Sequence, residues 1–196
     1  MGSFSQAGKI GSICRVDYLI MKKIIGLAVM GLVLLASACR DDVGEFLFEM
    51  NYPPRTLTLP AGTNTFTASV LSSNNIPTNY PDYLANSGHS AADVMKIQPT
   101  FARLESLDGL DIGFLSEISI RICPINQTNC TMADEAFYID DLYRRNISST
   151  RLQPGLRNFK ELLSGNLYKM EVVFFLGEIS PYSVDFRLEY GFDAFK

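Results

Sequence analysis

The chain has 196 residues and a formal net charge of −4, and 47% of its residues are hydrophobic, which suits one core of ordinary domain size. This acidic balance argues against a nucleic-acid partner, which would need a basic surface. With one histidine and no tryptophan, the chain has little material for imidazole-dependent catalytic or metal sites, and we expect no cofactor and no metal.

Residues 21–39, MKKIIGLAVMGLVLLASAC, have a basic start, an apolar run of about a dozen residues and small residues before Cys39. The run suits a signal peptide and is short for a membrane span of about 20 residues. The segment resembles a bacterial lipoprotein signal with Leu35–Cys39 as the lipobox. That resemblance implies cleavage before Cys39 and lipidation of its thiol. A buried helix or a true transmembrane anchor is the alternative.

Residues 1–20 would displace the basic region from the amino terminus, so we expect translation to begin at Met21. Removal of residues 1–38, which carry four basic and one acidic side chain, changes the net charge from −4 to −7. A domain of that charge is repelled by anionic headgroups, so the lipid has to hold it at the membrane.

The residues Arg40, Asp41 and Asp42 follow the lipobox directly. They resemble the basic-acidic-acidic export signal of surface lipoproteins in the Bacteroidota. The resemblance implies a lipid-anchored protein of the outer membrane that is exposed at the cell surface. A periplasm-facing orientation, with these charges as a solvated tether, is the alternative. The organisation that we predict is a leader and signal peptide (1–38), a tether (39–44) and a single domain (45–196).

The mature chain alternates apolar and polar residues in many segments, as half-buried strands do. In residues 116–123, for example, Ile118, Ile120 and Ile122 alternate with polar neighbours. The run 166–177 becomes continuously apolar, which predicts a central strand buried on both faces. The predicted strands are 45–51, 55–60, 64–72, 101–107, 116–123, 166–177 and 183–192. We predict an all-β, antiparallel β-sandwich, with immunoglobulin-like or jelly-roll topology left open.

Helical spacing is rare in this part of the sequence. Residues 156–165 place leucines and a phenylalanine at helical intervals and end in Ser164-Gly165, which predicts one short crossover helix. Residues 90–97 predict one or two further turns. The segment 72–90, which joins the predicted strand 64–72 to these turns, is polar and rich in Asn, Pro and Tyr. We expect a long functional loop there. Tyr80, Tyr83 and His89 are its candidate contacts for a ligand or partner.

Cys123 and Cys130 enclose a six-residue segment at the end of a predicted strand. An oxidising envelope compartment permits a disulfide between them, and we favour it over two free thiols. A metal site would need further ligands that the neighbouring sequence lacks.

Catalytic patterns are weak. His89 has no nucleophile motif beside it, and the acidic pairs Asp108/Asp111, Asp134/Glu135 and Asp140/Asp141 fall in expected loops. The favoured function is therefore a non-catalytic binding or structural subunit of an envelope complex, with a protein partner. The alternative is a surface module that captures glycans, and a weaker one is a hydrolase that uses acidic residues.

Overall fold

The alternating segments form antiparallel strands in the computed structural model, which describes residues 44–196. These residues make up one compact unit, Gly44–Lys196. The predicted lipidation site Cys39 and export signal Arg40, Asp41 and Asp42 lie outside the described residues. Within the described part of the chain, no helix combines the length and the hydropathy needed to span a bilayer.

Strands make up most of the described chain. They are β1 (Phe46–Asn51), β2 (Arg55–Leu59), β3 (Ser69–Pro77), β4 (Lys96–Ser106), β5 (Leu115–Cys123), β6 (Glu135–Ile139), β7 (Ser149–Pro154), β8 (Leu167–Leu176) and β9 (Val184–Phe195). The helices are α2 (Tyr80–Ser87), α3 (Lys160–Leu163) and the short 3₁₀-helix η1 (Met132–Asp134).

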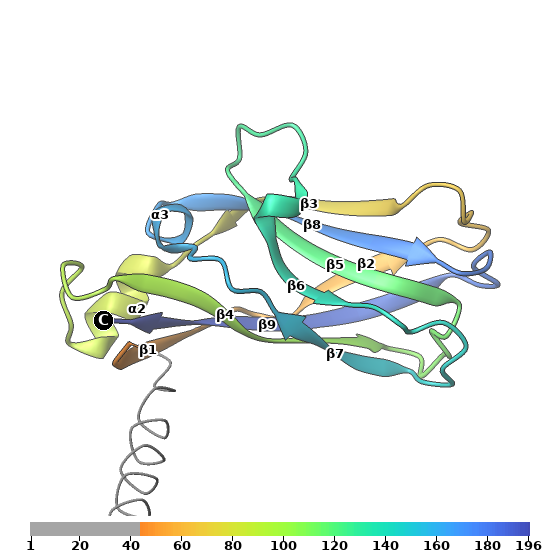
Figure 1. Ribbon diagram of the computed structural model, residues 1–196, viewed down its shortest axis with the longest axis horizontal. Helices are drawn as coiled ribbons and strands as arrows, with labels where there is room; N and C mark the ends of the chain where they lie inside the picture. The colour runs from red at the N-terminus through yellow and green to blue at the C-terminus, as the bar shows by residue number, and fades with distance from the viewer. Residues whose placement is uncertain (1–43) are drawn as a thin grey trace, which may run out of the picture. The chain divides into compact units, whose positions relative to one another are not determined.

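The strands form two layers (Figure 1). Sheet A has the order β1/β2-β9-β4-β7, and sheet B has the order β6-β5-β8-β3. Residues 149–152 of β7 pair with β4 and its last residues pair with β6, so this strand joins the two sheets along one side. Strands near the start of the chain pair with strands near its end, and each following pair lies closer to the middle of the sequence. β1 and β2 pair with β9, β3 with β8, β4 with β7, and β5 with β6. This nested pairing is a jelly roll, which resolves the topology that the sequence left open.

The edges of the sandwich are irregular. β1 and β2 run in succession along β9, and the segment Tyr52-Pro53-Pro54 breaks the strand between them. Proline lacks the amide that a ladder needs and is tolerated at such an edge. On the opposite sheet, the edge strand β3 has a bulge between Ser73 and Ile76, where Asn75 has a φ of 55°.

The core lies between the two sheets, where the alternating apolar side chains of both inner faces meet. On β9 these are Val184, Phe186, Leu188, Tyr190 and Phe192, all fully buried. The predicted central strand is confirmed: β8 is buried from Tyr168 to Phe174 on both faces. Its inner face belongs to the core, whereas its outer face lies under a loop that is described below.

Three buried tyrosines lie at the end of the core that is next to α2. The Tyr52 ring stacks on Tyr190 with 5.2 Å between centroids, and the Tyr190 and Tyr168 hydroxyls are hydrogen-bonded at 2.7 Å. The Tyr52 hydroxyl donates to the Thr78 carbonyl at 2.9 Å. Burial raises the pKa of Tyr52 and Tyr168 far above the ordinary value, so both hydroxyls stay protonated and can donate.

Residues 64–68 do not belong to a strand, contrary to the prediction for 64–72. The Asn64 side chain accepts hydrogen bonds from the backbone amides of Phe66 and Thr67, which fixes a turn and leaves the Phe66 ring 93% exposed. The strand begins only at Ser69. An alternating pattern was overridden here by local side-chain hydrogen bonds to the backbone.

The predicted helices also needed correction. The helix expected over 156–165 is reduced to α3, because Asn158 accepts a hydrogen bond from the Ile97 amide and ties the preceding residues to β4. Residues 90–97 contain a turn in which the Asp93 carboxylate accepts hydrogen bonds from the Ser90 amide and hydroxyl, and then the start of β4. The strands β6 and β7, which lack long alternating runs, were not predicted.

Candidate functional site

The most prominent surface feature is the segment between β5 and β6, residues 124–134, which we call the disulfide loop. It stands out from the sandwich beyond sheet B (Figure 1). Cys123, the last residue of β5, forms a disulfide with Cys130, and their Cα atoms are 5.6 Å apart. The disulfide that the sequence favoured is therefore present. It closes the base of the loop and limits the conformations that the enclosed residues can adopt.

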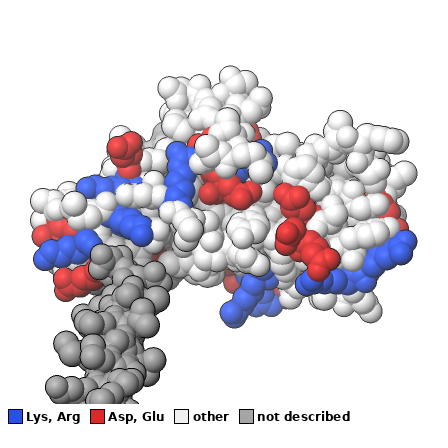
Figure 2. All heavy atoms as spheres, in the orientation of Figure 1, with Lys and Arg blue, Asp and Glu red and all other residues white. Residues whose placement is uncertain are grey.

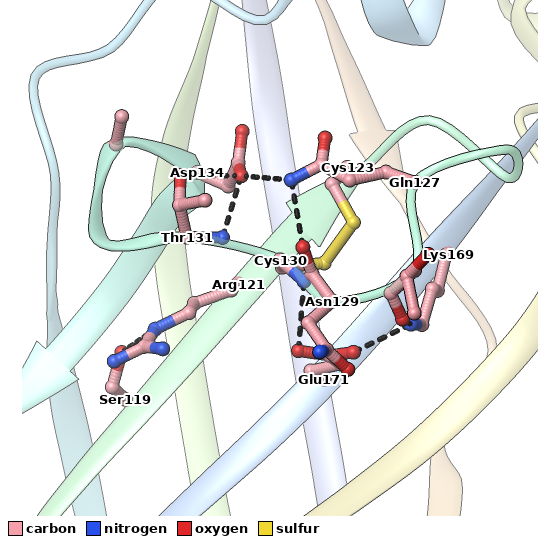
Figure 3. Close-up of a disulfide and its surroundings, with 12 residues drawn as sticks. Ser119, Arg121, Cys123, Gln127, Asn129, Cys130, Thr131, Asp134, Lys169 and Glu171 are labelled. Atoms are coloured by element: carbon pink, nitrogen blue, oxygen red, sulfur yellow. Dashed lines mark hydrogen bonds and ion pairs between the residues drawn. A yellow bond between two sulfur atoms is a disulfide. The ribbon is translucent and has the colours of Figure 1, made fainter.

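An ion pair on β8 lies directly beneath this loop. Lys169 and Glu171 point to the outer face of sheet B and are 6% and 3% exposed, with Nζ and Oε1 2.5 Å apart. Lys169 donates to the Thr128 carbonyl at 2.6 Å, and Glu171 accepts from the Cys130 amide at 3.0 Å (Figure 3). Because each charge also bonds the loop backbone, the pair fastens the loop to the sheet.

Asp134 holds the other end of the loop. Its carboxylate accepts hydrogen bonds from the Thr131 amide (2.7 Å) and hydroxyl (2.8 Å) and from Gln127 Nε2 (2.8 Å) (Figure 3). It also forms an ion pair with Arg157 at 2.5 Å. Burial raises the pKa of Asp134, but the hydrogen bonds from Thr131, Arg157 and Gln127 together hold it well below the usual range. The carboxylate is thus ionised at neutral pH and organises η1 through a capping box.

The outward surface of the disulfide loop is uncharged. Residues 124–133 contain no acidic or basic side chain, and this projection is white in Figure 2. Ile125 and Met132 are 50% and 65% exposed. A loop that is fastened by a disulfide and buried polar bonds, yet presents apolar side chains to solvent, is already ordered for binding. Such order lowers the entropy cost of association.

The segment 72–90 is not the long loop that we expected. It contains the end of β3 and the helix α2, which Pro81 starts and Gly88, with a φ of 74°, ends. The Tyr80 ring is 6% exposed and lies against Phe48, with 6.4 Å between centroids. Its predicted role as an exposed contact is wrong, because helical spacing turns it toward β1. The signals for this helix were present in the sequence as proline near its start and glycine after its end.

Tyr83 is partly buried, and its hydroxyl donates to the Asn51 carbonyl at the end of β1. This side chain therefore attaches α2 to sheet A and stays partly exposed, and its predicted role as a contact stays a prediction. His89 is exposed, as expected, and its backbone amide donates a hydrogen bond to Ser87 Oγ at 3.2 Å.

Four of the six acidic residues singled out in the sequence have local partners: Asp111, Asp134, Glu135 and Asp141. Glu135 accepts from Ser119 at 2.6 Å, and Asp111 accepts from the amides of Gly113 and Ile147, both at 3.0 Å. Asp141 pairs with Arg145 at 2.6 Å. Within residues 44–196, no three side chains of His, Cys, Asp or Glu are placed to hold a metal ion.

Lys169 and Glu171 were not among the site residues predicted from the sequence. A usable signal was available, because they are opposite charges two positions apart in an otherwise apolar strand, and so share one face. Charges at such positions are rarely buried unless they are paired.

No family model matches the chain, and no curated protein matches it. Among solved structures, the Cocksfoot mottle virus structure is similar over 76% of this chain and 84% of the viral chain, with 9% identity and a TM-score of 0.24. Tobacco necrosis virus is similar over 74% and 96%, with 9% identity and a TM-score of 0.20. Scores this low carry no argument, and the jelly roll follows from the strand order alone.

Proposed function

We propose that this protein is a non-catalytic lipoprotein of the outer membrane that acts as an accessory subunit of an envelope complex. The signal-like segment ending at Cys39 supports the lipid anchor, and Arg40, Asp41 and Asp42 support exposure at the cell surface. The disulfide loop is the contact surface for a protein partner. The observation that carries this role is the combination of exposed Ile125 and Met132 with buried bonds that fix the loop beneath them.

The partners of the acidic residues, the residues that a hydrolase would use, support a non-catalytic role. Asp134 stabilises the disulfide loop, Glu135 accepts a hydrogen bond from Ser119 on β5, and Asp141 forms an ion pair with Arg145. These bonds give the carboxylates structural partners, whereas a glycosidase needs two carboxyl groups that face one substrate from about 5 to 10 Å apart.

Affinity purification from solubilised native membranes tests the accessory role. We expect the full chain to retain one partner at a fixed stoichiometry, and an Ile125→Ser, Met132→Ser variant to lose it. Ile179→Ser is the matched control, because Ile179 is also exposed (60%) but lies in the loop between β8 and β9. A partner that the loop variant retains, or that the control also loses, would contradict the assignment of the disulfide loop.

Metabolic labelling with a fatty acid tests the anchor separately. The wild-type chain should incorporate label and fractionate with the outer membrane, and Cys39→Ala should do neither. Protease treatment of intact cells then distinguishes the two orientations. Digestion supports surface exposure, whereas protection until the outer membrane is permeabilised supports the periplasm-facing alternative.

A further inference from the structure

Within residues 44–196, the outer face of sheet A is exposed along β4 and β7, whereas the disulfide loop covers part of the outer face of sheet B. A groove of about 340 Å³ crosses this face over β4, β7 and β9. Phe101, Arg103, Arg151 and Glu189 line it, and the alternation of each strand directs these side chains outward. The groove involves a small part of the surface, whereas stable protein interfaces use about 20–30 residues on each side. Its volume is that of a small-molecule site.

Two arginines face each other in this groove. Arg103 on β4 is the register partner of Arg151 on β7, so their Cβ atoms are direct cross-strand neighbours. Arg103 lies 3.4 Å from Glu105, and within residues 44–196 no ion pair involves Arg151. Like charges at opposite positions of a ladder destabilise it. An anion placed between the two guanidinium groups would remove that repulsion and accept hydrogen bonds from both.

An aromatic platform lies beside the arginines. β4 has a bulge between Pro99 and Phe101, after which the 43%-exposed Phe101 ring covers Gly191 of β9. A Cβ atom on Gly191 would come within 2.5 Å of this ring, so the glycine lets the ring lie close to the sheet. A flat, apolar surface of this kind can pack against the C–H face of a sugar ring.

Charged side chains follow one another along β9 on this face of the sheet. The arginine pair lines the groove, and Asp193, whose register partner on β1 is Glu49, lies outside its lining, beyond Gly191 on the same face of β9. Glu189 lies at the arginine end, because it is the register partner of Arg103 on β9, and it forms an ion pair with Arg187 at 2.7 Å. Thr100 donates to the Gly191 carbonyl at 3.3 Å. A ligand that fits has an anionic group at the arginine end and hydroxyl donors toward the carboxylates, with an apolar face between.

We propose that this groove binds an acidic saccharide, a sugar chain whose rings carry carboxylates. The carboxylate bonds Arg103 and Arg151, the C–H face of the ring packs on Phe101, and the hydroxyls donate to Glu189 and Asp193. This inference goes beyond the accessory role, because it uses the opposite sheet and none of the disulfide loop.

Calorimetric titration of the full chain in detergent with trigalacturonate tests the proposal. We expect saturable binding, with galactotriose, which has the same ring but no carboxylate, weaker by about tenfold or more. Arg151→Gln and Phe101→Leu should each weaken trigalacturonate binding by about tenfold. Arg144→Gln is the matched control, because it removes the same charge from an exposed site in the loop between β6 and β7. Its affinity should stay within about twofold.

Absence of binding, or equal binding of the neutral trisaccharide, overturns the proposal. So does binding that Arg151→Gln leaves unchanged, or that Arg144→Gln weakens as much. Should Phe101→Leu fail to fold, the amide shifts of Arg103 and Arg151 in the wild type report the same contact. If they do not move during titration with trigalacturonate, the groove is not the site. None of these outcomes depends on the partner of the disulfide loop.

Discussion

The outer faces of the two sheets use charge in opposite ways. On sheet B, Lys169 and Glu171 are buried, paired with each other and bonded to the loop above them. On sheet A, Arg103 faces Arg151 in an open groove. Both sets occupy outward-facing positions of their strands. The difference teaches that outward charges become part of the fold when a neighbouring segment covers them, and remain exposed when none does.

The largest effect should come from breaking the covered pair. Lys169→Met leaves Glu171 buried without its counter-charge, so the free energy of unfolding should fall by about 3–5 kcal/mol. Arg103→Met, at a 45%-exposed side chain of sheet A, should change it by no more than about 0.5 kcal/mol. Urea denaturation at pH 7 measures both. Equal losses would mean that the two faces do not differ as described.

The disulfide should rank next. Cys123→Ser with Cys130→Ser should lower the free energy of unfolding by about 2–3 kcal/mol, because the unfolded chain regains the entropy of a short loop. A reductant should produce a similar loss in the wild type and none in the variant. If the variant responds to the reductant, the stabilisation comes from elsewhere.

Asp134 should make the covered face sensitive to acid. Its pKa is lower in the folded than in the unfolded protein, so its contribution is complete above about pH 4 and disappears as the pH falls through the folded value. Asp134→Asn should cost about 2 kcal/mol at pH 7 and flatten the decline below pH 4. Stability measured by denaturation from pH 7 to 2 checks this. A variant that declines as steeply as the wild type would contradict it.

Ionisation of Asp193 on sheet A should lower the stability of the fold, which is the opposite of the effect of Asp134. Burial and the facing Glu49 raise the pKa of its carboxyl, so ionisation costs stability in the folded state. That cost is present above the folded pKa and is relieved as the pH falls through it. Asp193→Asn should therefore stabilise the protein by about 0.5 kcal/mol at pH 7, and the gain should vanish in acid. Denaturation midpoints at both pH values are the measurement.

The smallest effect should come from Arg151→Gln, which removes the repulsion with Arg103. We expect a gain of a few tenths, about 0.3 kcal/mol, that shrinks at high salt. Thermal denaturation at low and high ionic strength measures it. A clear loss of stability would mean that Arg151 has a structural role like that of Lys169.

Much of the sandwich could be predicted, because a period of two is a local property that sequence displays directly. The strand around Ile118, Ile120 and Ile122 is an example, and the disulfide followed from two cysteines at the end of that strand. The helix α2 was missed because a polar composition was given more weight than its proline and glycine boundaries.

The groove on sheet A could not be predicted from a local sequence pattern. Arg103 and Arg151 meet only because β4 and β7 pair in one register, and Phe101 faces outward only because a bulge precedes it. Neither register nor bulge can be read from a single sequence, since both depend on how distant strands pack.

The bulge in β3 has a consequence for molecules crowded side by side. A straight outer strand would offer its free amides and carbonyls to a second molecule and seed polymers. Asn75, with its positive φ, and the nearby Pro77 interrupt that row of hydrogen-bonding groups. The same kink that shapes one rim of the sandwich thereby discourages edge-to-edge growth.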